Sequence, residues 1–337
     1  MENVLIAETD RIGDVILSLP VFKTLKKFDK NIKITALVSP YTKEIFECFK
    51  YVDDIIEYFE SPKNYYESML LKISSRNFDT AIVLHPDYKV AKALKKCKIP
   101  KRISYGFRWY QFLFTDVLIQ HRSKNLMHQL EYNLEILKLL GIEKFNKDIT
   151  LKPCSEDLDF IKKVLSKYKI LNKKIIGVHP GSGKSSIGLN TKKYIELLKK
   201  LKNEFRNAEI IITHTKNDKN IIEEIIKNLD VSVNIMPANL NLSQLIALIS
   251  LTNVFISNST GPLHIASALR IPVVGFYSPV FIHSPIRWGP YWGKKLVIKP
   301  DVNCPEKWKC KKEKCKYYDC FDNISFEKVS EFIKKYL

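Results

Sequence analysis

The sequence lacks any apolar run long enough to cross a membrane. Its 337 residues are 45% hydrophobic, but the apolar stretches are short, whereas a membrane-spanning helix needs roughly 18 consecutive apolar residues. The N-terminal segment, residues 1–7, also lacks the basic start and long apolar core of a secretion signal. We therefore expect a cytoplasmic protein.

Two common nucleotide-binding motifs are also absent. Glycine is scarce, at 11 residues, and Gly13 stands in the first strand-to-helix turn with no G-x-G-x-x-G pattern around it, which argues against a dinucleotide fingerprint. Residues 183–185 end like a P-loop, but Val178 occupies the place of that motif's first glycine. What remains is a turn of small residues, hydroxyls and a lysine, which suits a phosphate close to the backbone.

Acidic residues are too few to balance the basic ones. The chain has 36 Asp and Glu against 55 Lys and Arg, a net charge of +19, and the excess peaks between Lys294 and Lys316. Such a surface attracts polyanions: nucleic acid, an anionic membrane face or a phosphorylated substrate. The alternative is a lysine-rich solvated surface without a partner. No nucleic-acid-binding motif accompanies the charge, so we do not expect nucleic acid as the partner.

The placement of the cysteines matters more than their number, because four of the 7 fall close together. No C-x-x-C pair occurs among them. In a cytoplasmic protein such a cluster indicates a structural zinc site, one or two disulfides, or free thiols, and the sequence leaves all three open. In each case the role is to hold a loop that has few apolar residues of its own. The four are Cys304, Cys310, Cys315 and Cys320.

Short apolar runs alternate with helical patterns in two successive series, which predicts two doubly wound α/β domains. We place them at residues 1–155 and 156–337, with the final helix, Ser325–Tyr336, either in the second domain or packed back on the first. Predicted strands are Val4–Ala7, Ile32–Val38, Thr80–Leu84, Lys174–Val178, Glu209–Thr213, Val254–Ser257 and Ile271–Tyr277. Predicted helices are Asp14–Phe28, Tyr41–Phe49, Met127–Leu140, Asp157–Tyr168, Thr191–Phe205, Asp218–Leu229 and Leu242–Ser250.

The most informative stretch follows the predicted strand Val254–Ser257. Small residues at 257–261 make a turn that opens a helix, so unpaired backbone N–H groups and the positive end of a helix dipole meet at one point. A phosphate or pyrophosphate is the natural occupant of such a place. The turn is expected at the carboxyl edge of a parallel sheet, where α/β proteins bind their ligands.

A second turn of interest precedes the first helix. Asp14 stands at the mouth of that helix, where a carboxylate is an N-cap by default. It is also well placed to face a cleft between two domains, and the spacing alone leaves both roles open.

Three separated segments together resemble glycosyltransferase family 9, the heptosyltransferase type. They are residues 11–20 (RIGDVILSLP), 179–183 (HPGSG) and 258–266 (NSTGPLHIA). The resemblance implies the GT-B architecture, in which two Rossmann-like doubly wound domains face each other across a cleft.

The resemblance also implies roles for single residues. Asp14 corresponds to the family's general base, with Arg11 and Gly13 beside it on the acceptor side. The family's usual basic residue after the Pro-Gly turn is missing from residues 186–190, so Lys184 is expected to replace it. Asp218 is matched to the acid that holds the nucleotide ribose. The full donor-binding set is Ser182, Gly183, Lys184, Asp218, Ser259, Thr260, Gly261, Pro262 and His264.

The activity implied by the resemblance is an inverting transfer of heptose from ADP-heptose to the lipopolysaccharide inner core, with no catalytic metal or cofactor required. The donor is expected on the C-terminal domain and a lipid-linked anionic acceptor on the N-terminal domain, at the inner face of the inner membrane. Alternatives are a transferase that uses another nucleotide sugar, a nucleotide-sugar epimerase on the same fold, and a non-catalytic polyanion binder.

Overall fold

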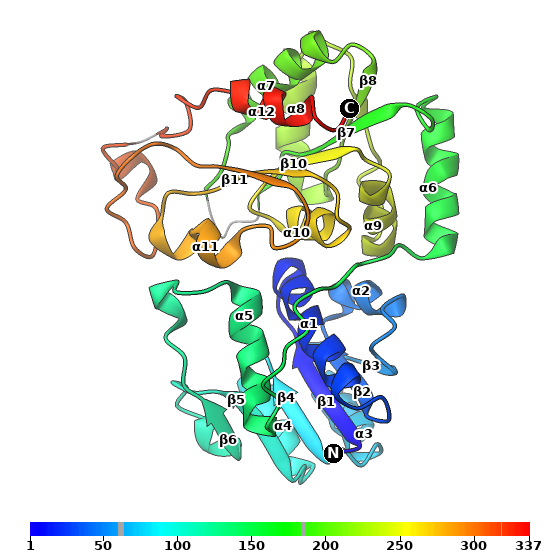
Figure 1. The fold of residues 1–337 in the computed structure, drawn as a ribbon, viewed down its shortest axis with the longest axis vertical. Helices are drawn as coiled ribbons and strands as arrows, with labels where there is room; N and C mark the ends of the chain where they lie inside the picture. Colours follow the sequence, from blue (N-terminus) through cyan, green and yellow to red (C-terminus); the bar gives the residue numbers. More distant parts are fainter. Residues whose placement is uncertain (60–63, 183–186, 318) are drawn as a thin grey trace. The chain divides into compact units, whose positions relative to one another are not determined.

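The computed structural model describes residues 1–59, 64–182, 187–317 and 319–337, and it divides into two compact units, Met1–Ile149 and Thr150–Leu337 (Figure 1). The division lies six residues before the boundary expected after residue 155. The connecting segment belongs to the second unit, because the backbone N–H of Leu151 donates to the carbonyl of Ala268 at 3.1 Å.

The first unit is built on a parallel sheet of six strands in the order β3-β2-β1-β4-β5-β6. Its strands are β1 (Asn3–Glu8), β2 (Lys33–Val38), β3 (Asp54–Glu57), β4 (Thr80–Val83), β5 (Lys101–Tyr105) and β6 (Asp116–Leu118). Its α-helices are α1 (Ile12–Phe28), α2 (Glu44–Glu47), α3 (Asn64–Ser74), α4 (Tyr88–Lys96) and α5 (Gln129–Leu134). Short 3-10 helices are η1 (Pro40–Thr42), η2 (Gln111–Leu113), η3 (Arg122–Lys124) and η4 (Glu135–Leu140).

Helices cover this sheet because its central strand is apolar on both sides. Residues 4–7 of β1 are all buried, as expected for a parallel strand between two helical layers. Leu5 and Ala7 point into the cluster that contains Met69 of α3 and Val90 of α4. Successive side chains of a strand alternate between its faces, so the residues between them face the opposite layer, in which α1 packs against α5.

The second unit repeats this plan, with strand order β12-β11-β10-β7-β8-β9. Its strands are β7 (Lys174–His179), β8 (Ala208–Ile212), β9 (Asn234–Ile235), β10 (Val254–Asn258), β11 (Val273–Phe276) and β12 (Lys295–Ile298). Its α-helices are α6 (Ser155–Lys167), α7 (Thr191–Glu204), α8 (Lys219–Asn228), α9 (Leu242–Ser250), α10 (Gly261–Ala268), α11 (Pro285–Trp288) and α12 (Glu327–Ile333). Its 3-10 helices are η5 (Lys216–Asp218), η6 (Phe281–His283) and η7 (Lys312–Lys314).

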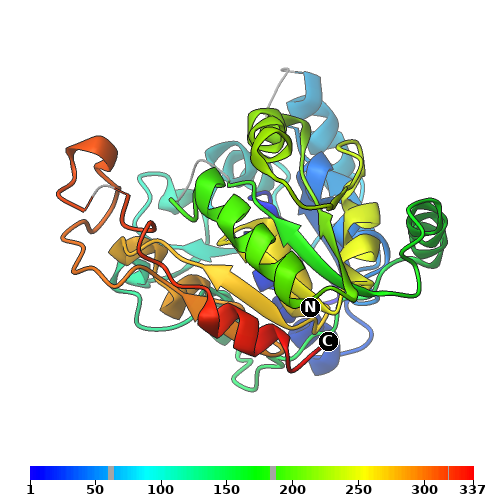
Figure 2. The ribbon, with the colours of Figure 1, turned by 90° about the horizontal axis from the view of Figure 1, so that it is seen from above.

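Two neighbouring residues of β7 show how the second sheet separates its layers. Ile175 packs with residues of α6 and α9, whereas Ile176 packs on the other face with α7 and α8. The final helix α12 joins that second layer through Val329 and Ile333, and Figure 2 shows it in red alongside α7. This core contact places the C-terminal helix in the second unit.

Both sheets are doubly wound, so the predicted α/β class of two Rossmann-like folds is confirmed. In each sheet the strand order reverses beside the first strand of its unit, between β1 and β4 and between β7 and β10. The crevice at the carboxyl ends of such a pair is where open α/β sheets bind ligands. Within the described residues, no helix has both the length and the apolar character that a membrane crossing requires.

Two predicted helices differ from the structure. The stretch Tyr41–Phe49 forms the 3-10 turn η1 and the single-turn α2, because Pro40 fixes the start of the turn and too few residues follow for a longer helix. The stretch Met127–Leu140 begins as α5 and continues as the 3-10 helix η4. It ends at Gly141, whose φ is 73°, a conformation that glycine adopts readily.

Candidate active site

The first candidate site lies at the carboxyl edge of the first unit's sheet, where β1 ends and α1 begins. Arg11 occupies the N-cap position of α1 without a side-chain capping hydrogen bond, and Asp14 stands in the first helical turn. The N-cap role weighed for Asp14 from the sequence is therefore wrong. Gly13 and Asp14 are half-buried and Arg11 is exposed. A carboxylate in this turn interacts favourably with the helix dipole.

Four more ionisable groups lie at this turn, and sequence reasoning did not select them as site residues: Glu8, Asp10, Tyr41 and His85. Glu8 ends β1 and His85 follows β4, and these two strands are hydrogen-bonded neighbours. Nδ1 of His85 lies 2.9 Å from Oδ2 of Asp10, and the backbone N–H of Asp10 donates to Oε1 of Glu8 at 3.3 Å. The Tyr41 hydroxyl donates to the carbonyl of Asp10 at 3.0 Å.

The electrostatics separate these groups into different protonation states. Burial raises the pKa of Glu8 to about 8, and the nearby charge of Asp14 adds to the rise. Glu8 is therefore mostly protonated at neutral pH. Burial alone would raise the pKa of Asp10, but the hydrogen bond and charge of His85 outweigh it and lower that pKa. The same hydrogen bond raises the pKa of His85. Carboxyl groups with such different pKa values in one place are typical of acid–base sites.

The second candidate site lies in the second unit, where β10 ends and α10 begins. Thr260 is the N-cap residue of α10, and its Oγ1 lies 2.8 Å from Oγ of Ser257. Pro262 has no N–H, and the N–H groups of Leu263 and His264 both donate to the carbonyl of Thr260. The predicted helix N-terminus is therefore present at this turn. Because the N–H groups of Leu263 and His264 already have a partner and Pro262 has no N–H, the backbone N–H groups that could bind a phosphate here are those of Thr260 and Gly261.

Other predicted donor-binding residues of this loop lie at different depths. Ser259 and Gly261 are half-buried, whereas Pro262 and His264 are buried. His264 sits in the first turns of α10, on the same short helix as the predicted pyrophosphate loop.

The neighbouring strand β7 brings His179 and Gly181 to the same sheet edge. Nδ1 of His179 lies 3.0 Å from Oγ1 of Thr213, and burial lowers the pKa of this histidine to about 4. His179 is therefore neutral at physiological pH. A Cβ on Gly181 would stand 2.6 Å from Oδ1 of Asp218 and 2.9 Å from Nε2 of His179. Only glycine fits there without displacing one of them.

Asp218, predicted to hold the donor ribose, has a structural task in this fold. Its Oδ2 accepts hydrogen bonds from the Thr215 backbone N–H at 2.8 Å and from the Thr215 hydroxyl at 2.7 Å. These bonds complete a capping box at the turn that leads into α8. Asp218 is also buried, so its position beside Gly181 is fixed by the fold.

The turn after β7 is only partly described. Ser182 is exposed, as a ligand-binding hydroxyl needs to be, while Gly183 and Lys184 lie outside the described residues. The next described segment is held by Asn258, the last residue of β10. Oδ1 of Asn258 accepts from the Leu189 N–H at 2.8 Å, and its Nδ2 donates to the Leu189 carbonyl at 3.3 Å. Sequence reasoning did not foresee that Asn258 holds Leu189. The available signal was an Asn side chain at the end of an apolar strand, where a buried amide needs hydrogen-bond partners.

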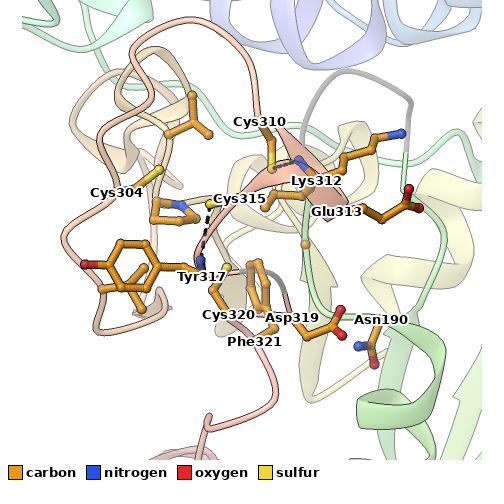
Figure 3. A pocket seen from close by; sticks show the side chains of 15 residues that line it. Asn190, Cys304, Cys310, Lys312, Glu313, Cys315, Tyr317, Asp319, Cys320 and Phe321 are labelled. Atoms are coloured by element: carbon orange, nitrogen blue, oxygen red, sulfur yellow. Dashed lines mark hydrogen bonds between the residues drawn. The ribbon is translucent and has the colours of Figure 1, made fainter.

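The four clustered cysteines, residues 304–320, lie in another part of the sequence from the residues of both candidate sites. They are free thiols in the structure (Figure 3), so no disulfide bond joins them there. Among the described residues, no group of three or more His, Cys, Asp or Glu side chains has the arrangement needed to hold a metal ion as it stands.

Comparison with known proteins points to one family. The model of glycosyltransferase family 9 (heptosyltransferase) matches residues 68–318. A Haemophilus influenzae protein that bears only a general glycosyltransferase name is 30% identical over 301 residues, covering 86% of each chain. Lipooligosaccharide heptosyltransferase 2 of Campylobacter jejuni is 24% identical over 330 residues, covering 96% of each chain.

A solved structure shares the fold. The Escherichia coli ADP-heptose lipopolysaccharide heptosyltransferase II superposes with a TM-score of 0.79 at 18% identity, covering 99% of this chain and 98% of its own. At this identity the likeness concerns the fold alone, and it supports the predicted GT-B class for the two Rossmann-like units.

Proposed function

The chain belongs to glycosyltransferase family 9 and is a glycosyltransferase, and we propose that it transfers heptose from ADP-heptose to the lipopolysaccharide inner core. The choice of heptose and of a lipopolysaccharide-type acceptor is supported by the Campylobacter jejuni relative, which is named as a lipooligosaccharide heptosyltransferase. In this proposal the second unit holds the nucleotide sugar and the first unit binds the acceptor.

The observation that carries the proposal is the position of Asp14. It stands in the first turn of α1, at the ligand-binding edge of the first sheet. Glu8 next to it is mostly protonated at neutral pH because burial raises its pKa to about 8, so it adds little negative charge to the site. A base in such a place can take a proton from a sugar hydroxyl.

The proposed reaction is a single displacement with inversion. The acceptor oxygen attacks the anomeric carbon of heptose and gives its proton to Asp14. The bond from that carbon to the diphosphate oxygen breaks, and its electron pair leaves with ADP. Positioned general-base catalysis of this kind contributes roughly 100- to 10,000-fold in rate.

The leaving diphosphate gains negative charge as the bond breaks. In the proposal, the N–H groups of Thr260 and Gly261 and the positive end of α10 stabilise this charge. The hydroxyls of Ser182 and Thr260 and the ammonium of Lys184 add hydrogen bonds or charge. We propose that these groups suffice without a metal or another cofactor.

The test is release of ADP from ADP-heptose, with and without heptose-deficient lipopolysaccharide. We expect acceptor-dependent release by the wild type and a loss of roughly 100-fold or more in Asp14→Asn. Asp29→Asn is the matched control, because Asp29 follows the other end of α1, and it should keep full activity.

Each other outcome has a defined meaning. No release by the wild type would contradict ADP-heptose as the donor and direct the search to other nucleotide sugars. Turnover of the donor without any acceptor would favour a nucleotide-sugar epimerase. Release that persists in Asp14→Asn would overturn the proposed base while leaving the family assignment intact.

A further inference from the structure

Large aromatic side chains are exposed near the carboxyl ends of β4 and β5. Tyr88, the first residue of α4, is 40% exposed. Trp109 and Phe112, in the stretch after β5, are 73% and 63% exposed. Burying such side chains would stabilise the fold, so a group of them left at the surface marks an interaction site.

The stretch after β5 is anchored in a way that leaves these side chains outside. Tyr110, Leu113 and Phe114 are buried in the core of the first unit, and η2 packs against α4. Trp109 and Phe112 alternate with these anchors and remain exposed. The exposed rings therefore stand on a segment that the core holds in place.

Two of the exposed rings pack against each other. The ring centroids of Tyr88 and Trp109 lie 5.0 Å apart, with the ring planes 32° from parallel. The ring of Tyr110 meets both of them edge-on, at 5.7 Å and 5.4 Å. Aromatic pairs at such distances attract each other. Tyr88 and Trp109 thus form a preorganised surface, here named the aromatic platform, which joins α4 to the stretch after β5.

The surroundings of the aromatic platform are strongly basic. Residues 80–115 contain eight Lys and Arg but a single acid, Asp87, and that acid is engaged in capping α4. Nζ of Lys92 lies 6.0 Å from the ring centroid of Tyr88, and Lys89 is exposed. Ammonium groups beside exposed rings suit a partner that has apolar faces and carries negative charge.

The aromatic platform lies at the same sheet edge as the candidate base. Tyr88 follows His85 by three residues, a separation of at most about 11 Å. The pKa of His85 is raised first by its hydrogen bond to Asp10 and also by the charge of Asp14, so both carboxylates lie near it. An acceptor whose hydroxyl reaches Asp14 therefore brings its neighbouring sugars to this part of the edge, and its lipid lies further along the molecule.

We propose that Tyr88 and Trp109 form an acceptor subsite that binds an acidic sugar, an inference that rests on the proposed function. The face of a sugar ring that carries C–H groups is apolar, and it packs on the aromatic platform and leaves water. A carboxylate or phosphate at the edge of that sugar pairs with the ammonium group of Lys89 or Lys92. The subsite selects and holds the acceptor and takes no part in the chemical step.

Calorimetry in the absence of donor tests the subsite. The probe is the deacylated, water-soluble oligosaccharide of heptose-deficient lipopolysaccharide. Trp109→Ala should weaken its binding by roughly tenfold and leave the melting temperature unchanged, because Trp109 is largely exposed. Trp308→Ala is the matched control, since Trp308 is also exposed but lies on the second unit, and it should bind the probe like the wild type.

The lysines are tested with the same probe. The double variant Lys89→Gln/Lys92→Gln should weaken binding and make it less sensitive to salt, because salt screens the charges that it removes. Lys163→Gln/Lys167→Gln removes two exposed lysines of the second unit and should bind as the wild type does.

Three results would overturn the subsite. One is a wild type that does not bind the oligosaccharide, and another is equal binding by the wild type and Trp109→Ala. The third is a Trp109→Ala variant that keeps the oligosaccharide but no longer partitions onto phospholipid vesicles free of saccharide, because the aromatic platform would then contact the membrane. The binding assay contains no donor, so its failure leaves the proposed transfer reaction untouched, and ADP release tests that reaction separately.

Discussion

Nδ1 of His85 lies 2.9 Å from Oδ2 of Asp10, and this pair joins the loop after β4 to the loop after β1. Asp10 is held on its other side by the Tyr41 hydroxyl, which donates to its carbonyl at 3.0 Å. The pair therefore stabilises the turn that leads into α1, the helix whose first turn contains Asp14. His85 acts on the turn through Asp10 and is a positioning residue.

Replacing His85 by Gln should weaken the fold in a pH-dependent way. Because the pKa of His85 is raised, its contribution is fully present below an unfolded pKa of about 6.5 and is lost as pH rises through the folded pKa. Because the pKa of Asp10 is lowered, its contribution is present above about 3.9 and is lost as pH falls. The destabilisation should be larger at about pH 5.5 than at about pH 9, and below about 1 kcal/mol because the pair is partly exposed.

Denaturant unfolding at the two pH values measures this effect. Arg76→Gln is the control, because Nε of Arg76 pairs with Oδ2 of Asp54 at 2.7 Å, an ion pair that contains no histidine. Its cost should be equal at both pH values. An equal cost for His85→Gln would mean that the histidine supports the turn without its charge.

Glu8→Gln should stabilise the protein increasingly as pH rises. The pKa of Glu8 is raised from 4.5 to about 8 by burial and then by Asp14. A raised pKa contributes stability that is complete below the unfolded value and is lost as pH rises through the folded value. Gln stays neutral, so the free energy of unfolding of the variant should exceed that of the wild type by an amount that grows to a few kcal/mol by about pH 8.

Chemical denaturation across this pH range, with the exposed Glu143→Gln as control, measures the difference. Glu143 is exposed, so its variant should follow the wild type at every pH. A Glu8→Gln curve parallel to that of the wild type would show that Glu8 is charged at neutral pH. This result would contradict the proposal that Glu8 adds little negative charge beside Asp14.

How far the sequence predicts this molecule depends on the range of the interactions involved. The strands with continuous apolar runs, such as Val254–Ser257, were predicted because a short run of apolar residues indicates a strand that is buried on both faces. Asp54–Glu57 and Asn234–Ile235 were missed, since β3 and β9 are short edge strands with polar residues. Their pairing depends on a neighbour that is distant in the chain.

The sites follow the same rule. Asp14 and Thr260 could be proposed as site residues from the sequence because a local turn and a family resemblance point to each of them. Glu8 was missed because its unusual pKa arises from burial and from Asp14. The pairing of His85 with Asp10 was missed because the two residues meet only when β4 pairs with β1. For Asp218 the sequence suggested only a ligand role, which stays a prediction, and the hydrogen bonds that its carboxylate accepts from Thr215 were not foreseen.

Gly181→Ala should disturb the second unit's site sterically. The added Cβ would lie 2.6 Å from Oδ1 of Asp218 and 2.9 Å from Nε2 of His179, so one of them must move. Overpacking of this kind costs about 1–3 kcal/mol. We expect a lower melting temperature and weaker binding of ADP in calorimetry. Gly141→Asn is the control, because a Cβ there meets nothing within 4 Å and Asn tolerates its positive φ. Unchanged ADP binding in Gly181→Ala would show that the turn at Gly181 does not contribute to donor binding.

The basic segment near the C-terminus should bring the protein to anionic membranes. Lys309, Lys314 and Lys316 are exposed, and Trp308 beside them is 58% exposed, which suits an interfacial aromatic. Each lysine near an anionic surface contributes about 1 kcal/mol. The triple change to Gln at these lysines should therefore reduce partition onto vesicles of anionic phospholipid by roughly 100-fold.

Sedimentation with vesicles measures this partition. Exchange of Lys163, Lys167 and Lys169 to Gln is the matched control, because these lysines are also exposed and their loss alters the net charge equally. If charge alone governs binding, both triple variants lose affinity alike; if the segment is the contact, only the first does. Moderate salt should release the wild type, because ions screen exposed charges beyond about 10 Å. Binding that persists in salt, or that neutral vesicles support equally, would contradict an electrostatic contact with the acceptor's membrane.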